Sequence, residues 1–187
     1  MSNITPKLYE EVSSYLLSVS DYGKPRVFQK GDLICRAGDA VDHMFYMIRG
    51  LVKCSRIHHG KEVIYRLMED GSMVMGYSGF ITGEPSMENI ECLQECHGIW
   101  IRVKDIEDQR AANPAIDVVL RYMAEQHYLT MERRLVMLHH KSAEQRYRYF
   151  LEVMSAKIIE ETPMHCIASY LGVTPESFSR MKKKLII

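Results

Sequence analysis

The sequence predicts an α+β protein with three parts: a β-roll or jelly roll, one long helix, and a small domain of short helices at its C-terminal end. The first observation behind this prediction is a series of short apolar runs, broken by glycine turns, between Val27 and Val103. The second is a long heptad pattern after Pro114, and the third is a pair of short helical segments on either side of Gly172. A chain of 187 residues can bury one large core and one small core.

The β-roll is predicted from strand-length apolar runs that alternate with turn residues. Residues 44–48, 51–57 and 63–68 are such runs, and Gly50 and Gly71 mark the turns beside them. Several short strands with turn signals between them are typical of a sandwich or jelly roll. We therefore expect one β-rich domain across the first half of the chain.

Helical periodicity is found before and after these runs. Residues 6–19 predict an amphipathic helix, and a second helix is predicted from Pro114 to about His140. A heptad seam on the long helix consists of Val119, Tyr122, Gln126, Leu129, Arg133, Val136 and His140. A second apolar face consists of Ile116, Leu120, Met123, Met131, Leu135 and Leu138. Two apolar faces need two partners, most simply the β-roll and a second copy of the chain, whereas a core helix within one chain is the alternative.

The C-terminal segment has the signals of two short helices around a tight turn. Thr162 and Thr174 are the expected N-caps, and Pro163 and Pro175 are the expected first helical residues, where a missing N–H costs nothing. Gly172 is placed to end the first helix in the left-handed conformation. This pattern predicts a helix-turn-helix motif. An ordinary surface αα-hairpin with a basic tail is the alternative.

The second of these helices separates apolar from polar residues. Phe178, Met181 and Leu185 form a stripe that is expected to pack on the first helix. The opposite face suits a DNA major groove, because arginine can bond a guanine edge, glutamate can accept from cytosine, and lysines can hold phosphates. The predicted DNA-binding residues are Thr174, Pro175, Glu176, Ser177, Arg180, Lys182, Lys183 and Lys184.

Residues 167–180 resemble the helix-turn-helix of the Crp/Fnr family, the cyclic-AMP receptor protein and its relatives. Residues 28–32, 45–50 and 69–71 resemble the cyclic-nucleotide-binding-like β-roll of the same family. The resemblance implies a homodimeric bacterial transcription regulator that binds DNA and RNA polymerase in the cytoplasm. The long helix would be its dimer interface, formed by Val119, Tyr122, Gln126, Leu129, Arg133 and Val136.

The resemblance also divides the chain into domains. We expect the β-roll sensor domain at residues 1–113, the dimerisation helix at 114–140 and the helix-turn-helix domain at 141–187. A capping box over residues 142–145 predicts a helix start just after a hinge. The family follows its recognition helix with a small β-hairpin wing, and the sequence stops at Ile187, so either DNA binding is weaker than usual or the sequence is short.

Individual positions of the recognition helix and of the effector pocket depart from the family pattern. Glu176 and Arg180 match a base-contacting glutamate and arginine, whereas Pro175 replaces another base-reading arginine. In the pocket, Tyr77 replaces the glutamate that holds the ribose, and Glu88 adds like-charge repulsion toward a phosphate. The degenerate pocket positions are Gly76, Tyr77, Met87, Glu88, Met131 and Glu132. We therefore expect an unidentified small effector other than cyclic AMP.

Composition and the remaining motifs narrow the function classes. The chain is 47% hydrophobic and 26% charged with a net charge of zero, and it shows no apolar stretch of membrane-span length. Five scattered cysteines do not indicate a disulfide framework. We expect a cytoplasmic protein without a membrane partner.

An enzyme is an alternative for a jelly roll, because this fold also holds metal ions. A cupin metal site needs histidines one residue apart on a strand, whereas His58 and His59 are adjacent and would point to opposite faces. No catalytic constellation is found in the sequence, so we expect neither an enzyme nor a cofactor nor a metal. The second candidate function is a small-molecule-binding module with degenerate DNA recognition that acts through protein contacts.

Overall fold

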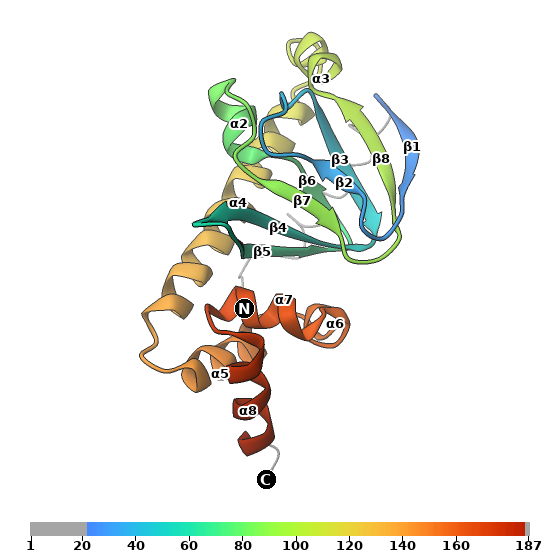
Figure 1. The fold of residues 1–187 in the computed structure, drawn as a ribbon. Helices are drawn as coiled ribbons and strands as arrows, with labels where there is room; N and C mark the ends of the chain where they lie inside the picture. The colour runs from blue at the N-terminus through green and yellow to red at the C-terminus, as the bar shows by residue number, and fades with distance from the viewer. Residues whose placement is uncertain (1–21, 186–187) are drawn as a thin grey trace.

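The fold is a β-sandwich joined by one long helix to a cluster of short helices, as shown by a computed structural model that describes residues 22–185 (Figure 1). The two sheets have the strand orders β1-β8-β3-β6 and β2-β7-β4-β5, and neighbouring strands are antiparallel. The strands are β1 (Gly23–Phe28), β2 (Leu33–Cys35), β3 (His43–Arg49), β4 (Leu51–His58), β5 (Lys61–Glu69), β6 (Ser72–Val74), β7 (Asn89–Cys92) and β8 (Cys96–Arg102). The predicted fold class is confirmed, while the helix predicted over residues 6–19 lies outside the described residues.

Two glycine turns shape the roll. Gly50 joins β3 to β4 at φ 152°, and a Cβ there would lie 2.5 Å from the Cys96 Sγ, so the position needs glycine. His59 and Gly60 join β4 to β5 with φ values of 49° and 72°. Two successive residues with positive φ match the right-handed twist of a two-residue hairpin. His58 and His59 thus lie at a hairpin tip, as the sequence predicted.

The long helix α4 (Ala115–His139) runs from the β-roll to the C-terminal helices (Figure 1). Ile116, Val119 and Met123 are buried in a cluster with Met44 and other residues of the roll. The prediction that Val119 faces a second copy of the chain is therefore wrong, because its side chain is 1% exposed within its own chain. A straight helix drifts by about 20° per heptad, so the roll takes residues from both predicted faces.

The capping residues that the sequence predicts lie at the ends of the short helices, except at the start of α7. They are α2 (Tyr77–Thr82), α3 (Val103–Gln109), α5 (Ala143–Val153), α6 (Ala156–Glu161), α7 (Met164–Leu171) and α8 (Pro175–Leu185). The capping box of α5 is confirmed, with Ser142 and Gln145 exchanging hydrogen bonds of 3.1 and 3.2 Å. Thr162 is not the N-cap of α7: it ends α6, and Pro163 takes the N-cap position. Within residues 22–185, no helix combines the length and apolar character of a membrane span.

The C-terminal helices and the β-roll share one hydrophobic core. Leu51, Ile64 and Leu67 of β4 and β5 lie in the same buried cluster as Phe150 of α5 and Phe178 of α8. The edge strand β5 also exchanges hydrogen bonds with α7, because the Ser169 hydroxyl accepts from the Ile64 N–H at 3.1 Å and donates to the Glu62 carbonyl at 3.3 Å. Helix α7 is therefore packed directly against the edge of the sheet.

Candidate functional site

The turn between α7 and α8 has the geometry of a helix-turn-helix. Gly172 ends α7 at φ 70° and ψ 38°, in the left-handed conformation that was predicted. The Thr174 hydroxyl accepts the Ser177 N–H at 3.2 Å, so Thr174 caps α8 and Pro175 is its first residue. Phe178 is 1% exposed and its ring meets the Tyr147 ring edge-on at 5.1 Å. These contacts fix which face of α8 is turned to solvent.

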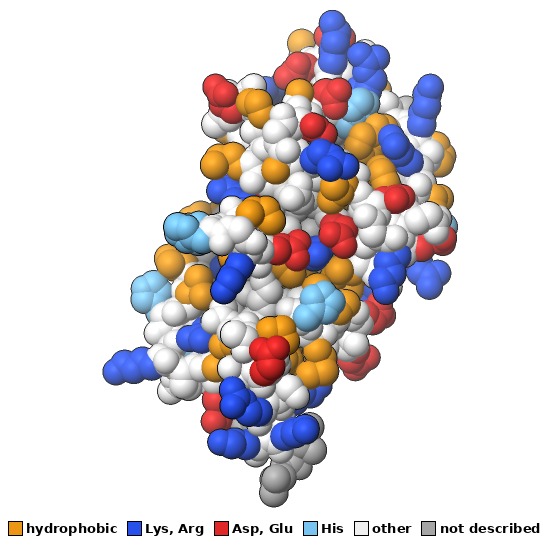
Figure 2. Space-filling view, viewed as in Figure 1, with side chains coloured by type: hydrophobic (Ala, Val, Ile, Leu, Met, Phe, Trp, Pro, Cys, Tyr) orange, Lys and Arg blue, Asp and Glu red, His pale blue; other side chains and the backbone are white. Residues whose placement is uncertain are grey.

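That solvent-facing surface of α8 is polar and basic. Glu176, Arg180, Lys183 and Lys184 are exposed, whereas Ser177 and Lys182 are partly buried. Hydrogen bonds to its own backbone N–H and to Thr174 lower the pKa of Glu176, which keeps its carboxylate an acceptor. Basic side chains gather at the lower end of the molecule, where α8 lies (Figures 1 and 2). The side chain of Leu185 lies outside the described part of the chain.

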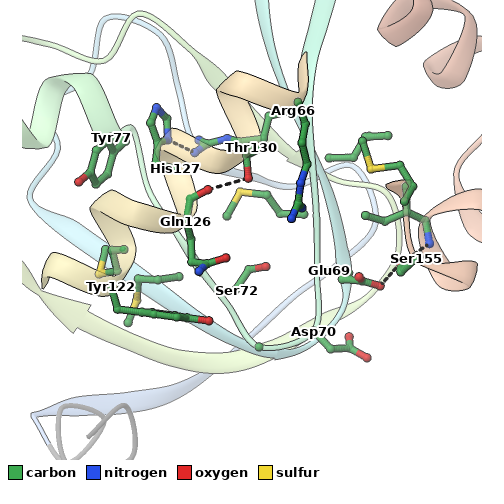
Figure 3. Close-up of a pocket in the computed structure, with 18 of the residues that line it drawn as sticks. Arg66, Glu69, Asp70, Ser72, Tyr77, Tyr122, Gln126, His127, Thr130 and Ser155 are labelled. Carbon is green, nitrogen blue, oxygen red and sulfur yellow. Dashed lines mark hydrogen bonds between the residues drawn. The ribbon is translucent and has the colours of Figure 1, made fainter. Parts of the chain in front are cut away.

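A second feature is a cavity of about 370 Å³ between the roll, α4 and the junction of α5 and α6 (Figure 3). One end lies near Tyr77 and His127, and the other lies near Asp70 and Ser155. Its walls combine thioethers, aromatic rings and polar groups, among them Arg66, Met68, Met73, Met75, Tyr122, Met123, Gln126, Thr130, Arg133, Met154 and Ile158. Because the roll, α4 and residues 153–158 all line it, a molecule in this cavity would contact the roll and the C-terminal helices together.

The end of the cavity near Tyr77 and His127 is built around Arg66 of β5. Its Nη1 lies 2.9 Å from the His127 Nδ1, and the His127 ring stacks on the Tyr77 ring at 4.4 Å. Burial and the Arg66 charge lower the pKa of His127 to about 4, so the ring is neutral and its Nδ1 can accept from the guanidinium. Behind Arg66 lies the Glu88 carboxylate, 3.3 Å from Nη2. Burial raises the pKa of the Glu88 carboxyl to about 7, against a hydrogen bond from Tyr77 N–H that lowers it.

The predicted pocket positions are only partly gathered here. Tyr77 lines the cavity, and Gly76 lies beside it, where a Cβ would approach the Ser86 Oγ to 2.7 Å. Met87 is 62% exposed and points away into solvent, while Glu88 is 2% exposed. Met131 and Glu132 lie on α4 outside the cavity lining, and their neighbours Thr130 and Arg133 contribute instead.

Residues from the predicted dimer seam take two different positions. Tyr122, Gln126 and Arg133 line the cavity against their own β-roll. The solvent-facing part of α4 carries a different apolar set, which we call the α4 strip. It consists of Tyr128, Leu135, Val136 and Leu138, with exposed fractions of 63, 57, 45 and 48%. Of the predicted seam, Val136 belongs to this strip, and Leu129 is partly buried.

Comparison with known proteins identifies the β-rich part of this architecture. Residues 25–113 match the cyclic nucleotide-binding domain family. This domain match covers the β-roll and ends before α4. No curated protein sequence matches the chain.

Solved structures of the same fold extend the likeness to the C-terminal helices. FixK2 from Bradyrhizobium japonicum superposes with a TM-score of 0.74 at 18% identity, covering 87% of this chain and 84% of that chain. The c-di-GMP responsive global regulator CLP from Xanthomonas campestris gives 0.75 at 18% identity, covering 92% and 91%. A CooA mutant from Carboxydothermus hydrogenoformans gives 0.70 at 14% identity, covering 89% and 78%. At these identities the likeness establishes the fold, with the cyclic nucleotide-binding domain at its N-terminal side.

Proposed function

We propose that this protein is a sequence-specific DNA-binding transcription regulator of the Crp/Fnr type, a regulatory protein rather than an enzyme. The observation that carries the proposal is the exposed face of α8, which presents Glu176 and Arg180 beside a run of lysines after a rigid Gly172 turn. Arg180 would read a base edge, and Lys182, Lys183 and Lys184 would hold phosphates. The similar fold of CLP, described as a global regulator of gene expression, supports this reading.

The DNA-bound form is proposed to be a two-fold dimer in the cytoplasm. The α4 strip is an exposed apolar surface on the helix that joins the two domains, and a second copy of the strip is its simplest complement. Two recognition helices related by such an axis would read a palindromic site. Recruitment of RNA polymerase by this dimer is part of the same proposal.

The effector is proposed to bind in the cavity between the roll, α4 and residues 153–158. A ligand there would touch both the sensor domain and the segment leading into the helix-turn-helix, so its binding energy could shift the position of α8. Cyclic AMP is not the proposed effector. Glu88 and Met87 stand where a phosphate would need a serine and an arginine, and Glu88 carries the wrong charge.

A gel-shift selection from random genomic fragments tests the DNA-binding function. We expect a small set of enriched fragments that share a palindromic sequence, with binding that weakens steeply as salt rises. The second candidate is a ligand-binding module that acts through protein contacts, and it is favoured by Pro175 in place of a base-reading arginine. Binding that is equal for all fragments, or absent at low salt, would favour that candidate.

A further inference from the structure

Arg66 is a cation that is buried inside the protein and needs a counter-ion. Its side chain is among the buried ones at 5% exposure, and its three nitrogens contact Glu88, His127 and Cys54. Burial raises the pKa of the Cys54 thiol to about 11, and His127 is neutral, so of these three partners Glu88 is the one that supplies negative charge. A buried guanidinium is costly unless such a charge is close.

The Glu88 carboxylate is held as a bound anion would be held. Its Oε1 accepts the Tyr77 N–H at 3.2 Å, and its Oε2 accepts from the Tyr65 hydroxyl and from Arg66 Nη2 at 3.3 Å. The loop that delivers it is fixed by Ser86, whose hydroxyl accepts the Glu88 N–H at 3.1 Å and donates to the Glu88 carbonyl at 2.9 Å. Both carboxylate oxygens are therefore matched with donors.

This carboxylate lies directly behind the wall of the cavity. Arg66 and Tyr77 both line the cavity, and both donate a hydrogen bond to Glu88. At a pH above 7, where Glu88 is ionised, an acidic molecule entering from the cavity would meet a guanidinium that is already neutralised, and a carboxylate that repels it. Removing the Glu88 side chain would leave Arg66, the Tyr65 hydroxyl and the Tyr77 N–H pointing at an empty space of carboxylate size.

We propose that the Glu88 carboxylate is a built-in ligand that fills the anion-binding position beside the cavity, in place of a carboxylate or phosphate from solution. A consequence, which rests on the proposed effector role of the cavity, is that the effector of this protein places no carboxylate or phosphate beside Arg66. The built-in ligand itself is tested without DNA and without any effector, so the two claims can fail separately.

Chemical rescue of Glu88→Ala tests the proposal. At a pH above 7, where Glu88 is ionised in the wild type, the variant should unfold at a temperature lower by roughly 10 °C, because Arg66 is left buried without its counter-ion. Tens of millimolar sodium formate or acetate should restore at least half of that shift, whereas sodium chloride of equal ionic strength should not. Broadening of the ¹³C-formate signal by the variant, and not by the wild type, would report binding directly.

Two further variants separate a rebuilt anion site from a general salt effect. Arg66→Met combined with Glu88→Ala should melt at a higher temperature than Glu88→Ala alone and should not respond to formate, because no cation remains at this position. Glu62→Ala is the matched control, because it removes one carboxylate beside Lys53, another buried cation. Lys53 keeps a second partner, Glu91, at 3.2 Å, so formate should not raise the melting temperature of this variant. If Glu88→Ala folds only when refolded with formate, the proposal is supported. Equal rescue by chloride, rescue of the double variant, or no response of Glu88→Ala to formate in either melting or refolding would overturn it.

Discussion

The Arg134 guanidinium of α4 donates a hydrogen bond to the backbone carbonyl of Tyr170 on α7 and lies 4.3 Å from the centroid of the Tyr170 ring. The same side chain reaches the Ile64 carbonyl of β5 at 3.4 Å and is 7% exposed. The long helix, the edge of the sheet and the first helix of the helix-turn-helix therefore meet at one buried cation. We infer that Arg134 holds these three elements together.

Replacing Arg134 with methionine should destabilise the protein by roughly 1–3 kcal/mol, because the Tyr170 and Ile64 carbonyls lose a buried donor. Urea denaturation followed by circular dichroism measures this loss. Arg133→Met is the matched control, since Arg133 is exposed and should change the free energy of unfolding by less than about 0.5 kcal/mol. Equal effects of the two substitutions would show that Arg134 does not hold this junction.

A charge on the α4 strip should prevent dimer formation. Leu135 is 57% exposed in the single chain, and Leu135→Asp would bury an unpaired charge where two strips meet. Sedimentation equilibrium should show a dimeric wild type and a monomeric variant. Leu151→Asp on α5 is the control, because Leu151 is 41% exposed and lies outside the strip. A monomeric wild type, or a dimer that survives Leu135→Asp, would contradict the assignment of the strip.

The pH dependence of stability should reveal His127, the partly buried histidine of the cavity. Burial and the Arg66 charge lower the pKa of His127 from 6.5 to about 4, so the unfolded chain takes up this proton before the folded one does. Stability is then fully present above pH 6.5 and is lost as the pH falls toward 4. His127→Asn keeps an acceptor for Arg66 but does not titrate, so its unfolding free energy should fall less steeply over this range. Parallel curves for the two proteins would mean that His127 is protonated as readily in the folded state.

Local signals explain why the turn between α7 and α8 has the geometry that the sequence predicts. Gly172, Thr174 and Pro175 act within one turn of the chain, and each position requires a property that its residue type supplies. The same kind of signal placed the N-cap of α7 one residue too early, at Thr162, because Thr162 is the residue that ends α6. β6 and β7 have only three and four residues, and strands this short are stabilised by distant partners rather than by a pattern of their own.

The residues that line the cavity were predicted much less completely from the sequence. A charged residue, Arg66, interrupts an otherwise apolar strand, and this is the one sequence signal that points to the cavity. Its partners Glu88 and His127 come from a loop and from α4, far away in the sequence. The sequence shows neither that these three side chains meet nor that Arg66 and Glu88 are buried. Similarly, the heptad pattern of α4 indicated two partners but not which residues face each, and Val119 was assigned to the wrong one.

The proposal that α8 reads DNA sequence is tested most directly by fluorescence anisotropy on a selected fragment and on a scrambled version of it. Arg180→Ala should cost roughly 1–3 kcal/mol on the selected fragment and little on the scrambled one, because Arg180 is proposed to contact a base. Lys183→Ala is the matched control: it should weaken both fragments alike and reduce the dependence on salt, as expected for a phosphate contact. Equal losses on both fragments for Arg180→Ala would contradict base reading by α8.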